Sequence, residues 1–176
     1  MTILGCSESQ DTSVNNVSKI NKLMVLTTVS PITSIVENIG GAHINLIGII
    51  PEGTNSHTFE PSPSVAKIIS DADLIILNGL FLEEPFLLMA KANAKPDAVI
   101  LLLGNKTINS EEWIFDFSFP EEAKKPNPHL WTDPILALKY AEIVKEQLIV
   151  FGIFWIFRVA HNIYYIYKLF SRQYFY

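Results

Sequence analysis

The histidines His57 and His129 each lie in a proline-rich loop that follows an apolar, strand-like run and precedes a predicted helix. The two loops are 53–64, GTNSHTFEPSPS, and 127–134, NPHLWTDP. Proline fixes φ, so it lowers the entropy lost when a loop presents a side chain to a ligand. Imidazole nitrogen binds Zn²⁺ and Mn²⁺, with carboxylate oxygen more prominent for the harder ion. Loops at the carboxyl ends of parallel strands line the ligand crevice of an open sheet, so the sequence predicts half of a metal site.

The simpler interpretation of each histidine is a loop residue that is hydrogen-bonded to the backbone. We expect this for His43, which follows Gly40-Gly41, and we assign no role to His161. A tight metal site needs about four protein ligands, or three and a water, and the chain shows no obvious further ligands. Chemistry on a substrate is a remote alternative: an α/β hydrolase would use Asp133 or Glu60 with a histidine. The nucleophile-elbow, P-loop and dinucleotide-binding motifs are all absent from the sequence.

Strand-like and helix-like segments alternate from residue 22 onward. The apolar, β-rich runs are 23–29, 44–50, 73–77 and 98–103. The helical segments are 31–39, 62–70, 83–93 and 133–148, with Ser30-Pro31, Ser62-Pro63 and Asp133-Pro134 as cap-plus-proline starts. Short connections between them predict an α/β lobe with a mostly parallel four-stranded sheet flanked by helices. We expect the histidine loops to follow neighbouring strands, and the helix 133–148 to bury Ile135, Leu138, Ile143 and Val144.

Composition limits the class of protein. The 176 residues fit one domain, and the net charge of −5 argues against nucleic acid or an anionic lipid surface as the main partner. Cys6 is the only cysteine, so neither an intrachain disulfide nor a cysteine-based zinc site can form. Its context, Ile-Leu-Gly-Cys-Ser, is similar to a lipoprotein cleavage box ahead of a polar tether, although only five residues precede it. The alternative is a chance Gly-Cys pair in a frayed terminus.

The segment 149–176 differs from the rest of the chain. It holds 11 of the 20 aromatic residues and contains no Asp or Glu. Its apolar run is too short for a membrane span, which needs roughly 20 residues, because Arg158 interrupts it. An interfacial helix is a further alternative. The preferred hypothesis is translation out of frame after a frameshift near codon 149, since Phe, Ile, Tyr, Lys and Asn codons are AT-rich.

Three segments together resemble a known family. They are PEGTNSHTFEPSPS at 51–64, ADLIILNGLFLE at 72–83 and NPHLWTDP at 127–134. Residues from about 22 to 148 resemble the N-terminal lobe of the zinc- and manganese-binding solute receptors of ABC transporters, the cluster A-I lipoproteins. The resemblance implies that His57 and His129 bind the metal between two α/β lobes joined by a long helix. The other ligands would come from a C-terminal lobe that we expect to be missing.

This resemblance implies the following division: a truncated signal and tether at 1–21, a metal-binding lobe at 22–132, the start of the connector helix at 133–148, and an aberrant tail at 149–176. The implied function is that of an extracytoplasmic, monomeric, non-enzymatic receptor. It would capture Zn²⁺ or Mn²⁺ as transported ligand, pass it to a membrane permease, and be lipid-anchored through Cys6. The alternative is a non-functional truncated fragment that binds metal weakly. The resemblance also raises the question of a histidine-rich loop of the zinc-receptor type. Residues 104–128 contain no histidine, which mildly favours manganese, or a zinc receptor without such a loop.

Overall fold

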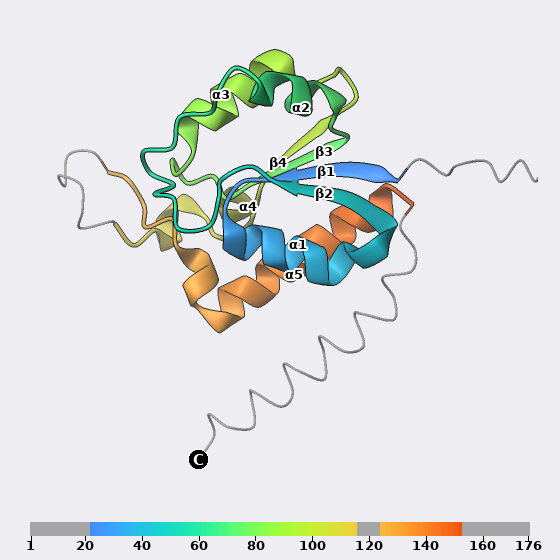
Figure 1. Cartoon of the computed structure of the whole chain (residues 1–176). Helices are drawn as coiled ribbons and strands as arrows, with labels where there is room; N and C mark the ends of the chain where they lie inside the picture. Colours follow the sequence, from blue (N-terminus) through green and yellow to red (C-terminus); the bar gives the residue numbers. More distant parts are fainter. Residues whose placement is uncertain (1–21, 116–123, 153–176) are drawn as a thin grey trace, which may run out of the picture.

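The computed structural model describes residues 22–115 and 124–152. Four strands form one sheet: β1 (Leu23–Thr27), β2 (Ile44–Gly48), β3 (Leu74–Leu77) and β4 (Val99–Leu102). Their order across the sheet is β2-β1-β3-β4, and every neighbouring pair is parallel (Figure 1). The predicted fold class is therefore confirmed. The predictions for Cys6, for the tether and for most of the 149–176 tail fall outside the described residues.

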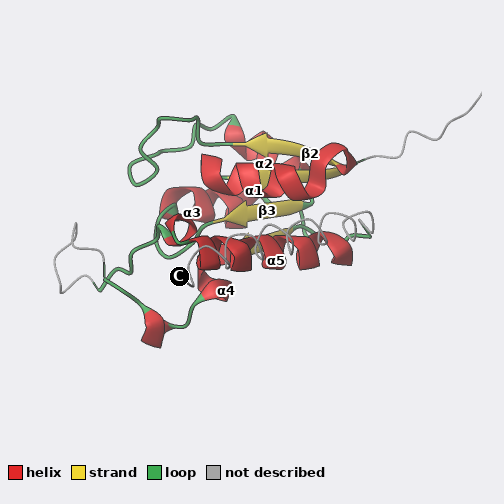
Figure 2. Ribbon diagram, turned by 90° about the horizontal axis from the view of Figure 1, so that it is seen from below, coloured by secondary structure: helices red, strands yellow, loops and turns green. Residues whose placement is uncertain are grey.

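Helices cover both faces of the sheet. One face carries α1 (Ser30–Gly40) and α5 (Pro134–Val150), and the other carries α2 (Val65–Asp71) and α3 (Glu84–Asn93) (Figure 1). The short helix α4 (Leu103–Thr107) follows β4 directly. Seen from below, α1 and α5 lie side by side beneath the sheet (Figure 2). This three-layer arrangement explains why β3, with the sequence Leu-Ile-Ile-Leu, is buried along its whole length.

Alternate strand residues divide the core into two clusters. The cluster under α1 and α5 includes Val25, Leu74, Ile76, Leu101, Tyr140, Val144 and Leu148. The cluster under α2 and α3 includes Leu26, Ile69, Ile75, Leu77, Phe86 and Ala90.

In α5 the buried positions are Tyr140, Val144 and Leu148, and Ile135 is 61% exposed. The prediction that Ile135 is buried is therefore wrong. The sequence analysis also missed Tyr140, because a tyrosine in a mixed helix did not stand out as a core residue.

Two of the three predicted helix starts are displaced. Helix α1 includes Ser30, and its cap position is Val29, whose carbonyl accepts from Thr33 N at 3.0 Å. Helix α2 begins at Val65, and the hydroxyls of Ser62 and Ser64 hydrogen-bond to each other at 2.8 Å, so neither caps the helix.

The third predicted start is confirmed, because Asp133 Oδ1 accepts from Ile135 N at 2.7 Å and from Leu136 N at 3.3 Å. This helix, α5, ends two residues beyond the predicted 148. No helix within 22–115 and 124–152 has both the length and the hydropathy needed to cross a bilayer.

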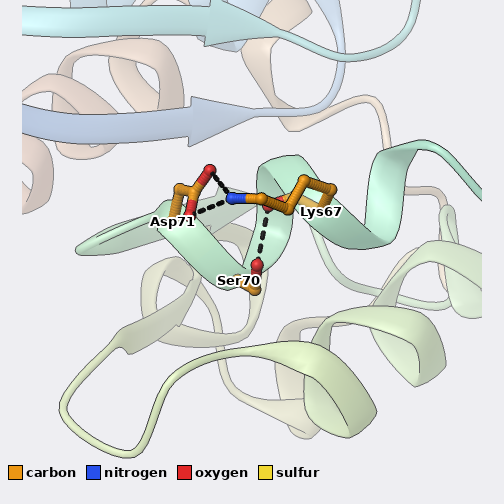
Figure 3. Close-up of polar contacts among 3 residues, drawn as sticks. All are labelled: Lys67, Ser70 and Asp71. Atoms are coloured by element: carbon orange, nitrogen blue, oxygen red, sulfur yellow. Dashed lines mark hydrogen bonds and ion pairs between the residues drawn. The ribbon is translucent and has the colours of Figure 1, made fainter.

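Ion pairs of two kinds stabilise the lobe. In α2, the Lys67 ammonium pairs with the Asp71 carboxylate one turn later, and Ser70 Oγ donates to the Lys67 carbonyl at 2.8 Å (Figure 3). Both charged groups of this pair are mostly exposed, so it contributes only a few tenths of a kcal/mol. The pair of Lys95 with Asp73 is less exposed, and Asp73 Oδ2 also accepts from Met24 N at 2.7 Å. Asp73, which directly precedes β3, therefore links β1 to Lys95 in the segment that leads into β4.

Replacement of Asp73 by Asn is expected to destabilise the lobe by about 1 kcal/mol at neutral pH. Partial burial raises the pKa of Asp73, but hydrogen bonds from Lys95 and Met24 N and the charge of Lys95 outweigh it, so the pKa lies below its usual 3.8. A lowered folded-state pKa adds stability above pH 3.8, and this stability is lost as the pH falls through the folded value. Urea unfolding at neutral pH and at about pH 3 should show the difference between D73N and wild type shrinking in acid. The exposed control Asp71→Asn should differ little from wild type.

Candidate metal centre

The structure brings the side chains of His57 and His129 into contact at the carboxyl end of the sheet. Their Nε2 atoms are 3.2 Å apart, and their ring centroids are 5.2 Å apart with an angle of 62° between the planes. Two nitrogens that bind one tetrahedral ion at about 2.0–2.1 Å each lie about 3.3 Å apart. The observed separation therefore fits two ligands of a shared ion. Without an ion the same contact is a hydrogen bond, in which one imidazole donates and the other accepts.

Both histidines are held by the same local turn. His57 N donates to Asn55 Oδ1 at 2.9 Å, and His129 N donates to Asn127 Oδ1 at 3.0 Å. An asparagine side chain that accepts from the backbone two residues on forms an Asx-turn, which fixes the backbone of the following residues. The sequence analysis missed these two asparagines. The repeated pattern Asn-x-His, at 55–57 and 127–129, was the signal that could have revealed them.

The two histidine loops do not follow neighbouring strands, contrary to the prediction. The loop with His57 follows β2, which lies at one edge of the sheet, whereas His129 comes after β4 at the opposite edge. The chain after β4 returns toward the middle of the sheet before it reaches His129. Phe115 forms an antiparallel bridge with Pro126, and Asn127 N donates to the Ile114 carbonyl at 2.7 Å. The parallel strands place both loops at the carboxyl end of the sheet (Figure 1). The return path, which periodicity in the sequence does not reveal, brings the His129 loop back toward β3, where Asn78 Nδ2 donates to the Pro128 carbonyl at 2.9 Å.

Other residues considered for the site lie elsewhere. His43 is exposed in the turn that precedes β2, at the amino end of the sheet and away from the two histidines. Asp133 uses Oδ1 to cap α5. His161 and Cys6 lie outside the described residues. Within the described part of the chain, no group of three or more His, Cys, Asp or Glu side chains is arranged to hold a metal ion, so this part supplies two candidate ligands.

The indole of Trp131 borders the site. Its ring centroid is 5.1 Å from that of His129, and the two planes are nearly perpendicular at 84°. Trp131 is partly buried and packs against the core cluster under α1 and α5. This edge-to-face contact with the Trp131 ring restricts the orientation of the His129 ring. It also provides a fluorescent group beside the candidate ligand.

The turn after β3 contains a buried carboxyl group. Glu83 is 4% exposed, and its carboxylate accepts from Thr28 Oγ1 at 2.6 Å, Asn78 N at 3.0 Å and Gly79 N at 3.1 Å. Burial raises the pKa of Glu83 above its usual 4.5, although the three donors oppose this rise. The backbone between these groups is left-handed at Gly79, Leu80 and Phe81, with φ of 77°, 52° and 64°. Such a conformation is unfavourable for Leu and Phe, and the Glu83 hydrogen bonds help to hold the turn in it.

Comparisons with known proteins match this chain to a single family. Residues 25–151 match a family model described as zinc-uptake complex component A periplasmic. The manganese-binding lipoprotein MntA of Halalkalibacterium halodurans is 31% identical over 127 residues, which are 72% of this chain and 39% of that protein. The manganese ABC transporter substrate-binding lipoprotein PsaA of Streptococcus pneumoniae is 30% identical over 151 residues, 84% of this chain and 46% of PsaA. The chain thus spans less than half the length of these curated relatives.

Solved structures of similar fold also bind metals. The periplasmic zinc binding protein TroA of Treponema pallidum matches with a TM-score of 0.68 and 25% identity, over 84% of this chain and 50% of TroA. The Mn-bound periplasmic metal binding protein of Candidatus Liberibacter asiaticus matches with a TM-score of 0.64 and 28% identity, over 87% of this chain and 52% of that one. In both cases the matched region is about half of the solved protein.

Proposed function

The chain belongs to the family described as zinc-uptake complex component A periplasmic, and from this premise we propose that it captures a divalent metal ion, Zn²⁺ or Mn²⁺, for uptake by an ABC transporter. The family match confirms the resemblance that the three sequence segments indicated. In this proposal the metal is cargo, and the protein performs no reaction on a substrate. The partner is the permease of the transporter in the membrane. Relatives named as lipoproteins support an extracytoplasmic location, with Cys6 as the lipid-bearing residue of a monomeric receptor.

The contact between His57 and His129 carries the proposal. Two imidazoles with Nε2 atoms 3.2 Å apart match the spacing of two ligands on one ion, and they come from loops that are 72 residues apart in the chain. A metal binds imidazole only in its neutral form, so protons compete with the ion. The affinity is therefore expected to fall as the pH is lowered.

The other ligands are expected to come from outside the described residues. Two imidazoles leave at least two positions of a tetrahedral ion for water or for further protein groups. The curated relatives are more than twice as long as the region matched here. We propose that residues 22–132 form one metal-binding lobe, that α5 begins the helix leading to a second lobe, and that this second lobe completes the coordination.

The presence of only two candidate ligands in the described region favours a second candidate, a fragment of such a receptor that binds metal weakly. Calorimetric titration of the metal-free, full 176-residue chain with Zn²⁺ and with Mn²⁺ tests both ideas. We expect saturable binding of one ion per chain, with proton release. Submicromolar binding would contradict the weak-fragment alternative. If a folded chain gives no saturable heat with either ion, the proposed function is wrong.

A further inference from the structure

Asn78 links the end of β3 to the loop that carries His129. It is fully buried and directly follows β3, one of the two inner strands of the sheet. Its side-chain Nδ2 donates to the carbonyl of Pro128 at 2.9 Å and to the carbonyl of Gly79 at 3.1 Å, and its Oδ1 accepts from the Tyr140 hydroxyl at 2.7 Å. The amide therefore connects three separate parts of the chain: the turn after β3, the His129 loop and α5.

The chemistry of these partners fixes the orientation of the amide. The carbonyl oxygens of Pro128 and Gly79 can only accept, so the NH₂ group of Asn78 must face them. A flipped amide would place Oδ1 against two carbonyl oxygens. Oδ1 must then face Tyr140, whose hydroxyl is the donor that this position requires. Tyr140 is itself 0% exposed, so water cannot readily replace its hydroxyl, and an unsatisfied Oδ1 would cost free energy.

The hydrogen bond to Pro128 acts directly beside the candidate ligand. Pro128 immediately precedes His129, is buried, and lacks an N–H, so its carbonyl is the polar backbone group through which it can be held. That carbonyl also accepts from Leu130 N at 2.9 Å. The peptide group that leads into His129 is thus fixed to the end of β3. The Asx-turn from Asn127 fixes the same residue from within the loop.

The His129 loop needs the hydrogen bond from Asn78 because the chain reaches it from the edge of the sheet. It arrives from β4 at the far edge of the sheet, whereas His57 comes from β2 at the other edge. β3 lies between them, next to β4. The Asn78 amide holds the returning chain above β3, at the place from which the His129 ring reaches His57. Few alternative positions of the loop would keep the two Nε2 atoms within the span of one ion.

We propose that Asn78 is a positioning residue that holds His129 within coordination distance of His57, and that Tyr140 fixes the orientation of its amide. This inference rests on the proposed function, because it treats the two imidazoles as ligands of one ion. Neither Asn78 nor Tyr140 is a candidate ligand, because their side-chain polar atoms hydrogen-bond to each other, to Pro128 and to Gly79. Preorganisation by residues that support the ligands typically changes metal affinity 10- to 100-fold.

Two variants of the full chain remove single hydrogen-bonding groups. Asn78→Asp keeps the size of the side chain and an acceptor for Tyr140, but it replaces the N–H donors that face Pro128 and Gly79 with a carboxyl oxygen. It also adds a second buried carboxyl group beside Glu83, whose Oε1 accepts from Asn78 N at 3.0 Å. Tyr140→Phe removes only the hydroxyl. Asn105→Asp is the matched control, because Asn105 is exposed and uses Oδ1 to accept from Leu80 N at 3.1 Å, a bond that Asp preserves. Thr107→Val controls for the loss of a buried hydroxyl, which here donates to the Leu103 carbonyl at 2.9 Å.

Each variant is measured for Zn²⁺ affinity by chelator competition, for thermal unfolding, and for the NMR cross-relaxation between the His57 and His129 rings in the metal-free chain. N78D and Y140F are expected to bind Zn²⁺ about tenfold more weakly and to lose the ring-to-ring signal. N105D and T107V should retain both, even where T107V lowers the unfolding temperature. Because the ring signal needs no metal, a wild-type chain that shows it but binds no Zn²⁺ would refute the proposed function and not the positioning.

The inference is wrong if folded N78D and Y140F keep the wild-type affinity and ring signal. If N78D does not fold, Y140F decides, because the loss of a hydroxyl leaves the packing of the ring in place. Loss of affinity in the two controls as well would also contradict the proposal, since it would show a general effect of destabilisation.

Discussion

Replacing either His57 or His129 with alanine is expected to weaken Zn²⁺ binding about 100-fold. Structural zinc sites bind with roughly 10–16 kcal/mol shared among four ligands, so each ligand contributes about 3 kcal/mol, or about two orders of magnitude in affinity. One remaining imidazole cannot chelate an ion, so each single variant already loses chelation. The double variant, which lacks both imidazoles, should bind no more tightly than either single one. Calorimetry with each variant, at a fixed pH, measures the effect.

His43→Ala is the matched control for these variants, because His43 is exposed and lies at the opposite end of the sheet. It should bind the ion as the unchanged chain does. The fluorescence of Trp131, whose ring is 5.1 Å from that of His129, gives a second readout that should respond to the ion in wild type and H43A only. Binding that survives in H57A and H129A but is lost in H43A would contradict the assignment of the ligands.

Replacing Glu83 with alanine is expected to destabilise the lobe by about 3–5 kcal/mol. The change leaves the Thr28 hydroxyl and the backbone N–H groups of Asn78 and Gly79 without their acceptor. Each unsatisfied buried group costs about 1–3 kcal/mol. Since whole domains are stable by only about 5–15 kcal/mol, this variant should be close to unfolding. Urea denaturation followed by circular dichroism measures the loss.

The charge of Glu83 can be tested separately with Glu83→Gln. Burial raises the pKa of Glu83 above 4.5 in the folded state. A raised carboxyl pKa means that its contribution to stability is fully present below pH 4.5 and is lost as the pH rises through the folded value. The stability of wild type relative to E83Q is therefore expected to decrease as the pH rises above 4.5.

The neighbouring glutamate provides the control for both Glu83 variants. Glu84 is exposed and pairs with Lys125 at 3.5 Å. Glu84→Gln should change the free energy of unfolding by less than about 0.5 kcal/mol. Equal effects of E83Q and E84Q across this pH range would show that burial of Glu83 does not govern its contribution.

The sequence predicted the sheet well because the apolar runs are short and regularly spaced. Continuous apolar segments such as Leu74–Leu77 are typical of strands that helices cover on both faces. Helix starts were harder to predict. Asp133 caps α5 as expected, whereas Ser62 and Ser64 bond to each other and leave α2 to begin later. Short polar side chains have several local partners, and periodicity does not indicate which one they choose.

The sequence singled out the two histidines that lie in contact, but it did not reveal the path of the chain that brings them together. The proline-rich loops identified His57 and His129, and the structure places their Nε2 atoms in contact. The strand order and the return of the chain across the sheet depend on tertiary contacts such as the one between Asn78 and Pro128, which no local pattern encodes. Tyr140 was missed for the same reason, because its role depends on a hydrogen bond to a residue 62 positions away.

The strand order also bears on how the chain is completed during synthesis. β2 pairs with β1, β3 pairs with β1, and β4 pairs with β3, so each new strand finds its neighbour already made. A chain that emerges from its N-terminus, after export as well as during synthesis, can therefore enlarge its sheet step by step. His57 emerges early, but the imidazole that meets it emerges only after the last strand. Under the proposed function, the two candidate ligands can therefore meet on one ion only after all four strands of the described sheet have emerged.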